Sequence, residues 1–304
     1  MISIVIPTYN RAKLIHRALD SVFAQTYGDW ECIVVDDFSQ DETKAVVEQY
    51  IAQDKRFRYV LNERKKGACG ARNTGILHAK GDYISFLDSD DSFVPETLHC
   101  QHDEFVKKPS IGMLYSRSLM YAEGIGTFPF GGDFGLQGLI YKEVLQQGYL
   151  AQTSVVSARR EYLLEVEMFD ENLPASQDDD LCFKLAKAYE VGYIDKNLAI
   201  MYVDANNRIT NIERPAMGWW MLWNKYEDDV LTLCGKETIA YHYKKCIGWF
   251  IKARKPMMVL KAMFKVAQYG WNLTFRQWIG VMAFIITGAK SVKVNRKAQK
   301  WIEN

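Results

Sequence analysis

A cluster of acids near residue 90 carries the clearest chemical signal in the chain. The hydrophobic run that begins at Tyr83 ends in Asp88, Asp90 and Asp91. Residues two apart in a strand point the same way, so we expect Asp88 and Asp90 to face one spot beyond a sheet. Two carboxylates there suit Mg²⁺ or Mn²⁺, which leave coordination positions for water and phosphates. The alternative is a helix start that favours acids, because Pro95 opens a predicted helix nearby.

The first hundred residues alternate β-rich runs with helical patterns. Strands are expected over residues 2–7, 31–36, 57–61 and 83–88, and helices over residues 12–25, 42–53 and 70–80. This alternation predicts an α/β fold with a mainly parallel central sheet and helices on both faces. Residues 39–42 predict a capping box at the start of the second helix. Such sheets bind ligands beyond the carboxyl ends of their strands, where the acid cluster lies.

Two other predicted strands also end in polar residues. Thr8 and Asn10 follow the first strand, and Asp36 and Asp37 follow the second. If these strands are neighbours, their ends and the acid cluster meet at one edge of the sheet. Each pair also has a structural explanation, because Thr8 and Asn10 could cap the next helix and the two aspartates could lie in a solvated turn.

The chain beyond residue 110 has a less regular pattern. A strand is expected over residues 111–121, and the glycine-rich residues 124–135 that follow fit either a mobile loop that closes over a ligand or a surface hairpin. Three acids at residues 178–180 open a helix predicted over residues 181–189. The helix dipole alone would favour acids at that place.

Composition is that of a globular protein with an uneven charge distribution. Residues 1–212 contain 22 Lys and Arg against 31 Asp and Glu, whereas residues 213–304 contain 16 against 6. We therefore expect a catalytic domain over residues 1–212 and a basic, aromatic helical region over residues 213–304. The six cysteines form no C-x-x-C pair, and no basic leader precedes the first strand. Both features favour the cytoplasm.

The basic region interleaves Trp and Met with Lys and Arg, as a helix at the surface of an anionic membrane would. A helical cap on the catalytic domain is the alternative. Its longest apolar run, residues 278–289, is too short to cross a bilayer. No nucleic-acid partner is expected, because no nucleic-acid module is visible.

The predicted clusters suit group transfer from a nucleotide diphosphate to a hydroxyl. A cation at the sheet edge can bridge phosphate oxygens, and a separate carboxylate about one sugar away could act as base. Residue spacing does not identify the transferred group.

A set of ordered motifs resembles family 2 glycosyltransferases. The matching segments are residues 4–11 (IVIPTYNR), 18–26, 34–43 beginning VVDD, 71–75 (ARNTG), 87–91 (LDSDD) and 169–181 beginning FDENL. The resemblance implies a GT-A fold, a nucleotide-sugar donor, a divalent cation and inversion at the anomeric carbon.

The resemblance also assigns roles to residues. Donor-binding residues would be Pro7, Thr8, Tyr9, Asn10, Asp37, Arg72, Asp88, Ser89 and Asp90. Among them, the segment from Pro7 to Tyr9 would cradle the base and Asp37 would accept the uracil imide N–H. Asp90 would bind the metal directly, with Asp88 at the ribose or at the hydration shell of the metal.

The remaining roles concern the acceptor side. Where the family has Glu-Asp, this chain has Gln177 and Asp178, so Asp178 is the expected general base and Asp180 the second choice. Gln177 would lie toward the acceptor, and Asp91 would either hold neighbouring backbone or face the acceptor. Some relatives place a metal-binding histidine after the last core strand; here Asp204 could replace it.

We therefore expect an inverting, metal-dependent glycosyltransferase that moves a hexose-type sugar from a UDP-sugar to a saccharide acceptor. The acceptor would be lipid-linked, in bacterial polysaccharide assembly such as O-antigen or capsule, with the enzyme at the inner face of the cytoplasmic membrane. Two alternatives are a non-catalytic nucleotide-sugar-binding scaffold and a sugar-phosphate nucleotidyltransferase. The latter needs a glycine-rich basic loop where this chain has residues 7–11.

Overall fold

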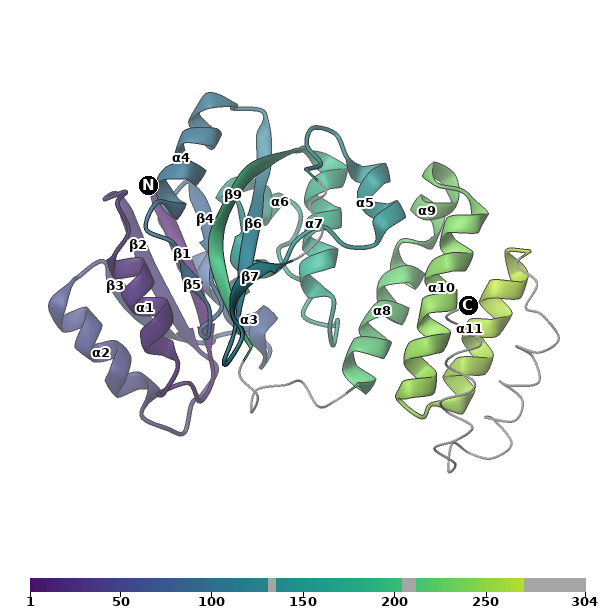
Figure 1. The fold of residues 1–304 in the computed structure, drawn as a ribbon, viewed down its shortest axis with the longest axis horizontal. Coiled ribbons are helices and arrows are strands. Elements are labelled where there is room, and N and C mark those ends of the chain that lie inside the picture. Colours follow the sequence, from purple (N-terminus) through teal and green to yellow (C-terminus); the bar gives the residue numbers. More distant parts are fainter. Residues whose placement is uncertain (131–134, 204–211, 271–304) are drawn as a thin grey trace. The chain divides into compact units, whose positions relative to one another are not determined.

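The computed structural model describes residues 1–130, 135–203 and 212–270 (Figure 1). The chain divides into two compact units. The first comprises residues 1–141, 149–171 and 178–208, and the second comprises residues 142–148, 172–177 and 209–304. The second unit thus includes two short segments that a single cut after residue 212 would leave in the first. Asp204 and residues 278–289 lie outside the described residues.

The described part of the first unit is built around a nine-stranded sheet. Its strands are β1 (Ile2–Thr8), β2 (Trp30–Asp36), β3 (Phe57–Leu61), β4 (Tyr83–Phe86), β5 (Ser92–Phe93), β6 (Ile111–Ala122), β7 (Gly126–Phe130), β8 (Val156–Arg159) and β9 (Glu190–Val203). Their order is β3-β2-β1-β4-β8-β6-β9-β5, with β7 paired to β6. The strands from β3 to β4 are parallel, whereas β8 is antiparallel to both of its neighbours. The α/β fold expected from the sequence is confirmed.

Helices cover both faces of the parallel half. The helices of this unit are α1 (Ile15–Phe23), α2 (Thr43–Gln53), α3 (Ala68–His78), α4 (Thr97–Lys107), α6 (Arg160–Glu165) and α7 (Gln177–Ala188), with the short η1 (Thr153–Val155) before β8. The helix α5 (Tyr141–Gln147), between β7 and η1, belongs to the second unit. The strand order steps one way from β1 to β3 and back to β4. Right-handed crossovers therefore place α1 and α2 on one face and α3 on the other.

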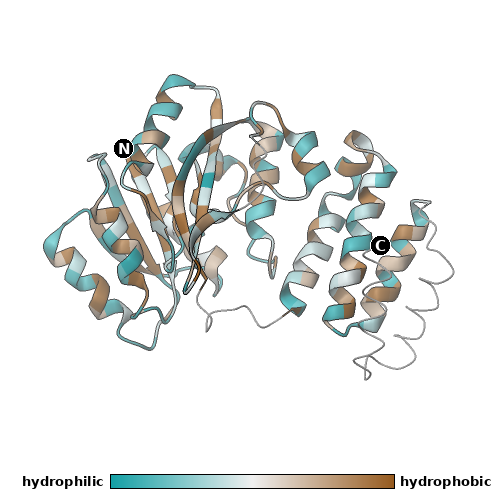
Figure 2. Ribbon diagram, viewed as in Figure 1, coloured by the Kyte–Doolittle hydropathy of each residue, from teal (hydrophilic) through white to brown (hydrophobic). Residues whose placement is uncertain are grey.

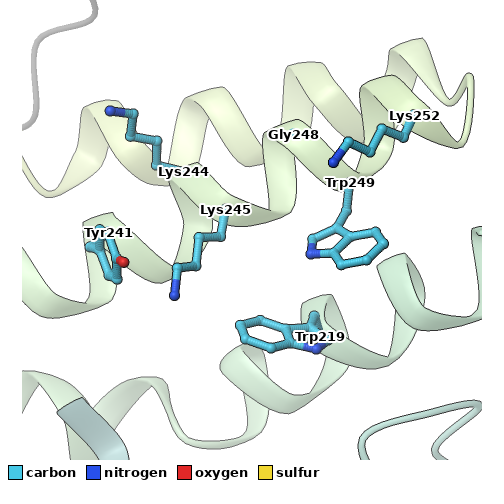
Figure 3. Close-up of a pocket in the computed structure, with 7 residues that line it drawn as sticks. All are labelled: Trp219, Tyr241, Lys244, Lys245, Gly248, Trp249 and Lys252. Carbon is cyan, nitrogen blue, oxygen red and sulfur yellow. The ribbon is translucent and has the colours of Figure 1, made fainter. Parts of the chain in front are cut away.

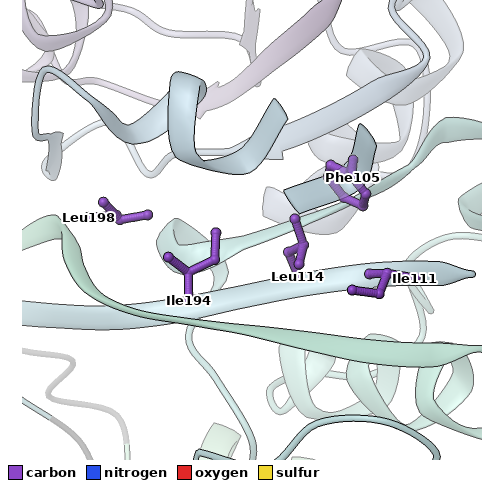
Figure 4. Close-up of a cluster of buried hydrophobic side chains, with 5 residues drawn as sticks. All are labelled: Phe105, Ile111, Leu114, Ile194 and Leu198. Atoms are coloured by element: carbon purple, nitrogen blue, oxygen red, sulfur yellow. The ribbon is translucent and has the colours of Figure 1, made fainter. Parts of the chain in front are cut away.

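Burial explains the composition of these elements. Every residue of β1 and β2 is buried, which is why both read as continuous apolar runs. Helix α3 packs directly on them, and a Cβ at Gly75 would come within 2.4 Å of Val5 Cγ1. Farther along the sheet, Phe105 of α4 covers a cluster contributed by β6 and β9, which contains Ile111, Leu114, Ile194 and Leu198 (Figure 4).

Two local predictions change with the structure. The glycine-rich segment forms a hairpin in its described part, because β7 pairs antiparallel with β6. The expected capping box is wrong. Ser39 donates its hydroxyl to Asp36 Oδ1 (2.6 Å), and α2 is instead preceded by Asp41, whose Oδ1 accepts the Thr43 N–H (3.1 Å).

The described part of the second unit is mainly helical. Its helices are α8 (Glu213–Lys225), α9 (Glu227–Leu233), α10 (Lys236–Lys252) and α11 (Pro256–Gln268). Figure 2 shows apolar and polar residues interleaved along α10 and α11, as expected for helices that bury one stripe. None of the helices within the described residues is long and apolar enough to cross a membrane.

A stacked pair anchors this helical unit. The rings of Trp223 and His242 lie 3.6 Å apart and nearly parallel. His242 Nε2 donates to the Leu145 carbonyl (2.9 Å), and Gly148 adopts φ 77° where a Cβ would meet Trp223 at 2.8 Å. These contacts explain why residues 142–148 belong to the second unit.

Candidate active site

The candidate site lies where the strand order reverses. β1 connects outward to β2, and β4 flanks β1 on its other side. The crevice beyond the carboxyl ends of two such strands is the usual ligand site of an open α/β sheet. The segments that begin at Thr8 and at Leu87 both leave the sheet there, and the Leu87 N–H still bonds to the Val5 carbonyl (3.2 Å).

The acid cluster is a turn and not the end of a strand. β4 ends at Phe86, and the Asp91 N–H bonds to the Asp88 carbonyl (3.1 Å). The prediction of a strand that continues to Asp88 is therefore wrong, and strand alternation does not explain why Asp88 and Asp90 face the same site. Both carboxylates belong to one tight turn instead, so they remain neighbours for a different reason.

Arginines from three elements surround this turn. Arg72 Nη2 bonds to Asp88 Oδ1 at 2.6 Å, and Arg17 Nη1 donates to the Asp90 carbonyl at 2.9 Å. Arg11 Nη2 lies 3.7 Å from Asp90 Oδ2. Even so, burial and the charge of Asp88 raise the pKa of Asp90. The arginines therefore do not fully offset the cost of burying the charge of Asp90.

Asp91 holds the turn in place. Its carboxylate is buried and accepts the Ser154 hydroxyl (2.7 Å) and the Tyr202 N–H (3.3 Å). The Ser154 hydroxyl also accepts the Asp88 N–H (3.1 Å). Burial, then the charge of Asp88, raises the pKa of Asp91. Asp91 thus contacts protein groups, and Ser89 beside it is buried as well.

The polar residues that follow β1 and β2 lie next to each other, because the Asp37 N–H bonds to the Thr8 carbonyl (2.8 Å). Asp37 is buried, and its Oδ1 accepts from Asn62 Nδ2 (2.6 Å). Asn10 links two loops, because its side chain accepts the Gln40 N–H (2.7 Å), and it caps no helix. Tyr9 next to it is 45% exposed.

Two buried polar atoms at this edge have no protein partner. Thr8 Oγ1 and Arg72 Nε are buried, and neither makes a hydrogen bond. Thr8 therefore does not cap α1, and Pro7 before it is a buried residue of β1. Buried polar groups are usually paired, so unpaired ones beside a crevice are consistent with a polar ligand.

The motif that contains Arg72 is hydrogen-bonded to the segment that begins at Phe169. Asn73 exchanges two hydrogen bonds with the Phe169 backbone, at 2.9 and 3.0 Å. The Phe169 ring lies 5.4 Å from the Arg72 guanidinium. Glu171 accepts from Asn73 Nδ2 (2.8 Å) and pairs with Arg64, and these hydrogen bonds lower its pKa below the ordinary value. Residues 71–75 therefore pack directly against Phe169 and Glu171.

Asp178 and Asp180 have different surroundings at the start of α7. Asp178 is partly exposed, while burial raises its pKa and the Arg72 charge lowers it. Asp180 is fully buried, and Lys184 Nζ lies 3.4 Å from its Oδ2. Gln177 donates to the Leu173 carbonyl (3.1 Å). Only Asp178 of the two aspartates is exposed enough to meet an acceptor.

The turn residues fit a divalent cation. Asp88 and Asp90 are hard oxygen donors, and burial, then the charge of Asp88, disfavours the charged form of Asp90, which a nearby cation would favour. Within the described ranges, no three His, Cys, Asp or Glu side chains converge as a metal site. Such a cation would complete its coordination with water or phosphate oxygens, as Mg²⁺ commonly does.

Comparison with known proteins decides the family. Residues 3–124 match the sequence model described as glycosyl transferase family 2. These residues form a family 2 glycosyltransferase domain. The GalNAc(5)-diNAcBac-PP-undecaprenol beta-1,3-glucosyltransferase of Campylobacter jejuni is 28% identical to this glycosyltransferase over 278 residues, which are 87% of each chain.

Solved structures share its fold. Residues 1–349 of S. aureus TarS in complex with UDP-GlcNAc give a TM-score of 0.69 at 18% identity, covering 99% of this glycosyltransferase and 90% of that chain. The mannosyltransferase PcManGT from Pyrobaculum calidifontis, in complex with GDP-Man and Mn²⁺, gives 0.56 at 18% identity, covering 95% and 85%. The expected GT-A fold is thus confirmed, and the expectation of a glycosyltransferase is confirmed by the family match and the Campylobacter relative.

Some site residues were missed by the motifs. Ser154 and Asn62 orient Asp91 and Asp37, and Arg17 binds the acid turn, yet none belongs to a recognisable pattern. Arg17 could have been suspected, because it falls on the polar side of the first predicted helix. Asn62 and Ser154 gave no signal of this kind.

Proposed function

We propose that this glycosyltransferase moves a hexose-type sugar from a UDP-sugar to a hydroxyl of a lipid-linked saccharide, with inversion and with a divalent cation. One observation carries the proposal: Asp37, Arg72 and the acid turn all lie at the carboxyl ends of β1, β2 and β4. That arrangement offers separate partners for a base, a diphosphate and a cation.

Asp37 suits the recognition of uracil. A carboxylate can only accept a hydrogen bond, and the uracil imide N–H can only donate one. Asn62 fixes the carboxylate through Oδ1. The neighbouring Thr8 hydroxyl and Arg72 Nε would supply further donor contacts, because both are buried without a partner. The UDP-GlcNAc bound to TarS supports the choice of a UDP-sugar.

Asp88 and Asp90 would hold the cation. Its positive charge would offset the negative charge that develops on the departing diphosphate, which favours the transition state over the ground state. Mn²⁺ in the PcManGT complex supports this assignment. Arg72 is placed to bind the same phosphates.

Asp178 would remove the proton from the acceptor hydroxyl. Burial raises its pKa toward the operating pH, as suits a general base. One base and a stabilised leaving group are enough for a single in-line displacement, and such a displacement inverts the anomeric carbon. Asp180 is too buried for this role.

The acceptor and its location are inferred from the relative and from charge. The Campylobacter relative is named for a saccharide on undecaprenyl diphosphate. Residues 213–304 carry a balance of ten positive charges, from 16 basic and 6 acidic residues. We infer a position at the inner face of the cytoplasmic membrane, in the assembly of a surface polysaccharide such as O-antigen or capsule.

A thermal-shift scan tests the donor assignment. Ligands that bind the native state raise its melting temperature. UDP and UDP-sugars should raise it with Mn²⁺ or Mg²⁺ present and much less with a chelator. CDP-sugars should have little effect, because cytosine N3 is an acceptor and offers Asp37 no imide N–H. Equal shifts for UDP and CDP would contradict uracil recognition through Asp37.

A further inference from the structure

The second unit contains a cavity of about 470 Å³ between α8 and α10 (Figure 3). Six side chains of two kinds line it: the aromatic Trp219, Tyr241 and Trp249, and the basic Lys244, Lys245 and Lys252. Trp219 belongs to α8, and the others belong to α10. No acidic residue is among the described residues that line the cavity.

Helical spacing builds this surface. Residues 241, 244, 245, 248, 249 and 252 recur at intervals of three and four, so they share one face of α10. Elsewhere in α10 the apolar residues are buried, including Tyr243, Ile247 and Phe250. The aromatic residues of α10 thus divide into a core set and a set that opens on the cavity.

Gly248 keeps the cavity open. It lies within α10, where glycine costs about 0.5–1 kcal/mol relative to alanine. A Cβ at this position would meet nothing within 4 Å, so neither close packing nor a left-handed backbone requires glycine. A small residue here preserves free space beside Lys245 and Trp249 (Figure 3).

Aromatic rings hold the ammonium groups at the cavity. Lys245 Nζ lies 4.5 Å from the Tyr241 ring centroid and 5.7 Å from that of Trp219. Lys252 Nζ lies 5.4 Å from the Trp249 centroid. A ring face attracts a cation without accepting a conventional hydrogen bond from it, and two rings hold the Lys245 ammonium in this way.

We propose that this cavity binds the phosphate head group of an anionic membrane lipid. Lysines are suited to the phosphate as compact positive charges, and Trp and Tyr are the residues that prefer the lipid–water interface. The inference extends the proposed function, because the lipid that carries the acceptor saccharide would itself present a phosphate group. Phospholipid and polyprenyl diphosphate offer the same chemistry to the cavity.

Vesicle binding of the full chain tests the proposal without any sugar donor, so its outcome does not depend on transfer. Three vesicle types are compared: phosphatidylcholine alone, with added phosphatidylglycerol, and with added polyprenyl diphosphate. We expect weak binding to the first and stronger binding to at least one of the others. The stronger of these two identifies the lipid. Equal binding to all three would overturn the proposal.

Matched variants separate the cavity from general charge. Lys245→Gln should weaken binding to anionic vesicles about fivefold, since one basic residue near such a surface is worth about 1 kcal/mol. Gly248→Phe, which fills the cavity and leaves the charge unchanged, should weaken it at least as much. Gly248→Ala and Lys261→Gln, the latter at an exposed position of α11, should stay within about twofold of the wild type.

Two results would overturn the cavity assignment. One is an equal loss for Lys261→Gln and Lys245→Gln, which would mean that only net charge matters. The other is normal vesicle binding by a Gly248→Phe protein. Thermal unfolding of each variant checks that the second unit is folded.

Discussion

The Arg72 guanidinium and the Asp88 carboxylate form an ion pair at 2.6 Å in which the arginine side chain is 9% exposed and the aspartate 36%. Arg72 comes from α3 and Asp88 from the turn after β4, so the contact joins two of the motif segments. In the absence of a ligand, Arg72 thus neutralises part of the charge that a cation would otherwise meet.

Replacing Arg72 should therefore change cation and nucleotide binding in opposite directions. In Arg72→Gln, Asp88 loses its partner, so Mn²⁺ should bind the protein alone more tightly than it binds the wild type. UDP should bind more weakly, because a phosphate contact is lost. Calorimetric titration with each ligand measures both effects. Weaker binding of Mn²⁺ together with UDP would contradict a competition between Arg72 and the cation for Asp88.

Asp90 and Asp91 should differ sharply although they are adjacent. Asp91→Asn keeps an acceptor for the Tyr202 N–H, and its amide NH2 can donate to the Ser154 hydroxyl oxygen in place of the bond that it loses. The raised pKa of Asp91 indicates that its charge is costly in the folded state. Metal-dependent UDP binding should then stay within about tenfold of the wild type, a change of about 1.4 kcal/mol. Asp90→Asn should abolish it. Similar losses in the two variants would refute a direct metal role specific to Asp90.

Asp180 should matter for stability and not for catalysis. It is fully buried beside Lys184, which also donates to the Met168 carbonyl (2.8 Å). Breaking a buried ion pair commonly costs about 3–5 kcal/mol. Because Lys184 is partly exposed, we expect a cost near the lower end of that range. We expect Asp180→Asn to lower the free energy of urea unfolding while kcat per folded molecule changes little. A large fall in kcat with normal stability would make Asp180 the base.

His242 should make the second unit sensitive to acid. Burial lowers its pKa to about 4, whereas in the unfolded chain it is close to 6.5. The folded state keeps the ring neutral, so unfolding takes up a proton between these values. The free energy of unfolding should be constant above pH 6.5 and fall by about 3 kcal/mol as the pH approaches 4.

The control for this prediction is His242→Phe, which preserves a ring against Trp223 but does not titrate. It loses the bond to the Leu145 carbonyl, so at neutral pH it should be less stable by about 1 kcal/mol. Tryptophan fluorescence in urea, read at several pH values, should show a smaller pH slope for the variant. Identical slopes would exclude His242 as the source.

The sequence predicted the parallel half of the sheet well because burial shaped it. β1 and β2 are covered on both faces, so their apolar runs are unmistakable, and the polar residues that follow them mark the sheet edge. Near Asp88 the same reasoning went wrong. The last strand-like bond is made by the Leu87 N–H, and only the contacts of Asp91 with Ser154 and Tyr202 fix the turn beyond it.

Other details depended on partners far away in the chain. The sequence could not show that Ser39 donates a hydrogen bond to Asp36. A helix cap would use the same hydroxyl, so the pattern fits either contact. Asn62 and Ser154 lie outside every motif. For the basic region, the sequence left membrane contact and a helical cap on the catalytic domain as alternatives. The described helices bury Trp223 and place Trp249 at the cavity, a division that the sequence pattern did not predict.

The central claim is that Asp178 moves the proton while the acid turn holds the donor. The most direct test measures UDP release from a UDP-sugar in the presence of a lipid-linked acceptor, for the wild type and for Asp178→Asn, beside UDP binding by both. We predict that kcat of the variant falls by a factor of about 10²–10⁴, the usual contribution of a general base, and that its metal-dependent UDP affinity is unchanged. Turnover by Asp178→Asn at the wild-type rate would contradict the account.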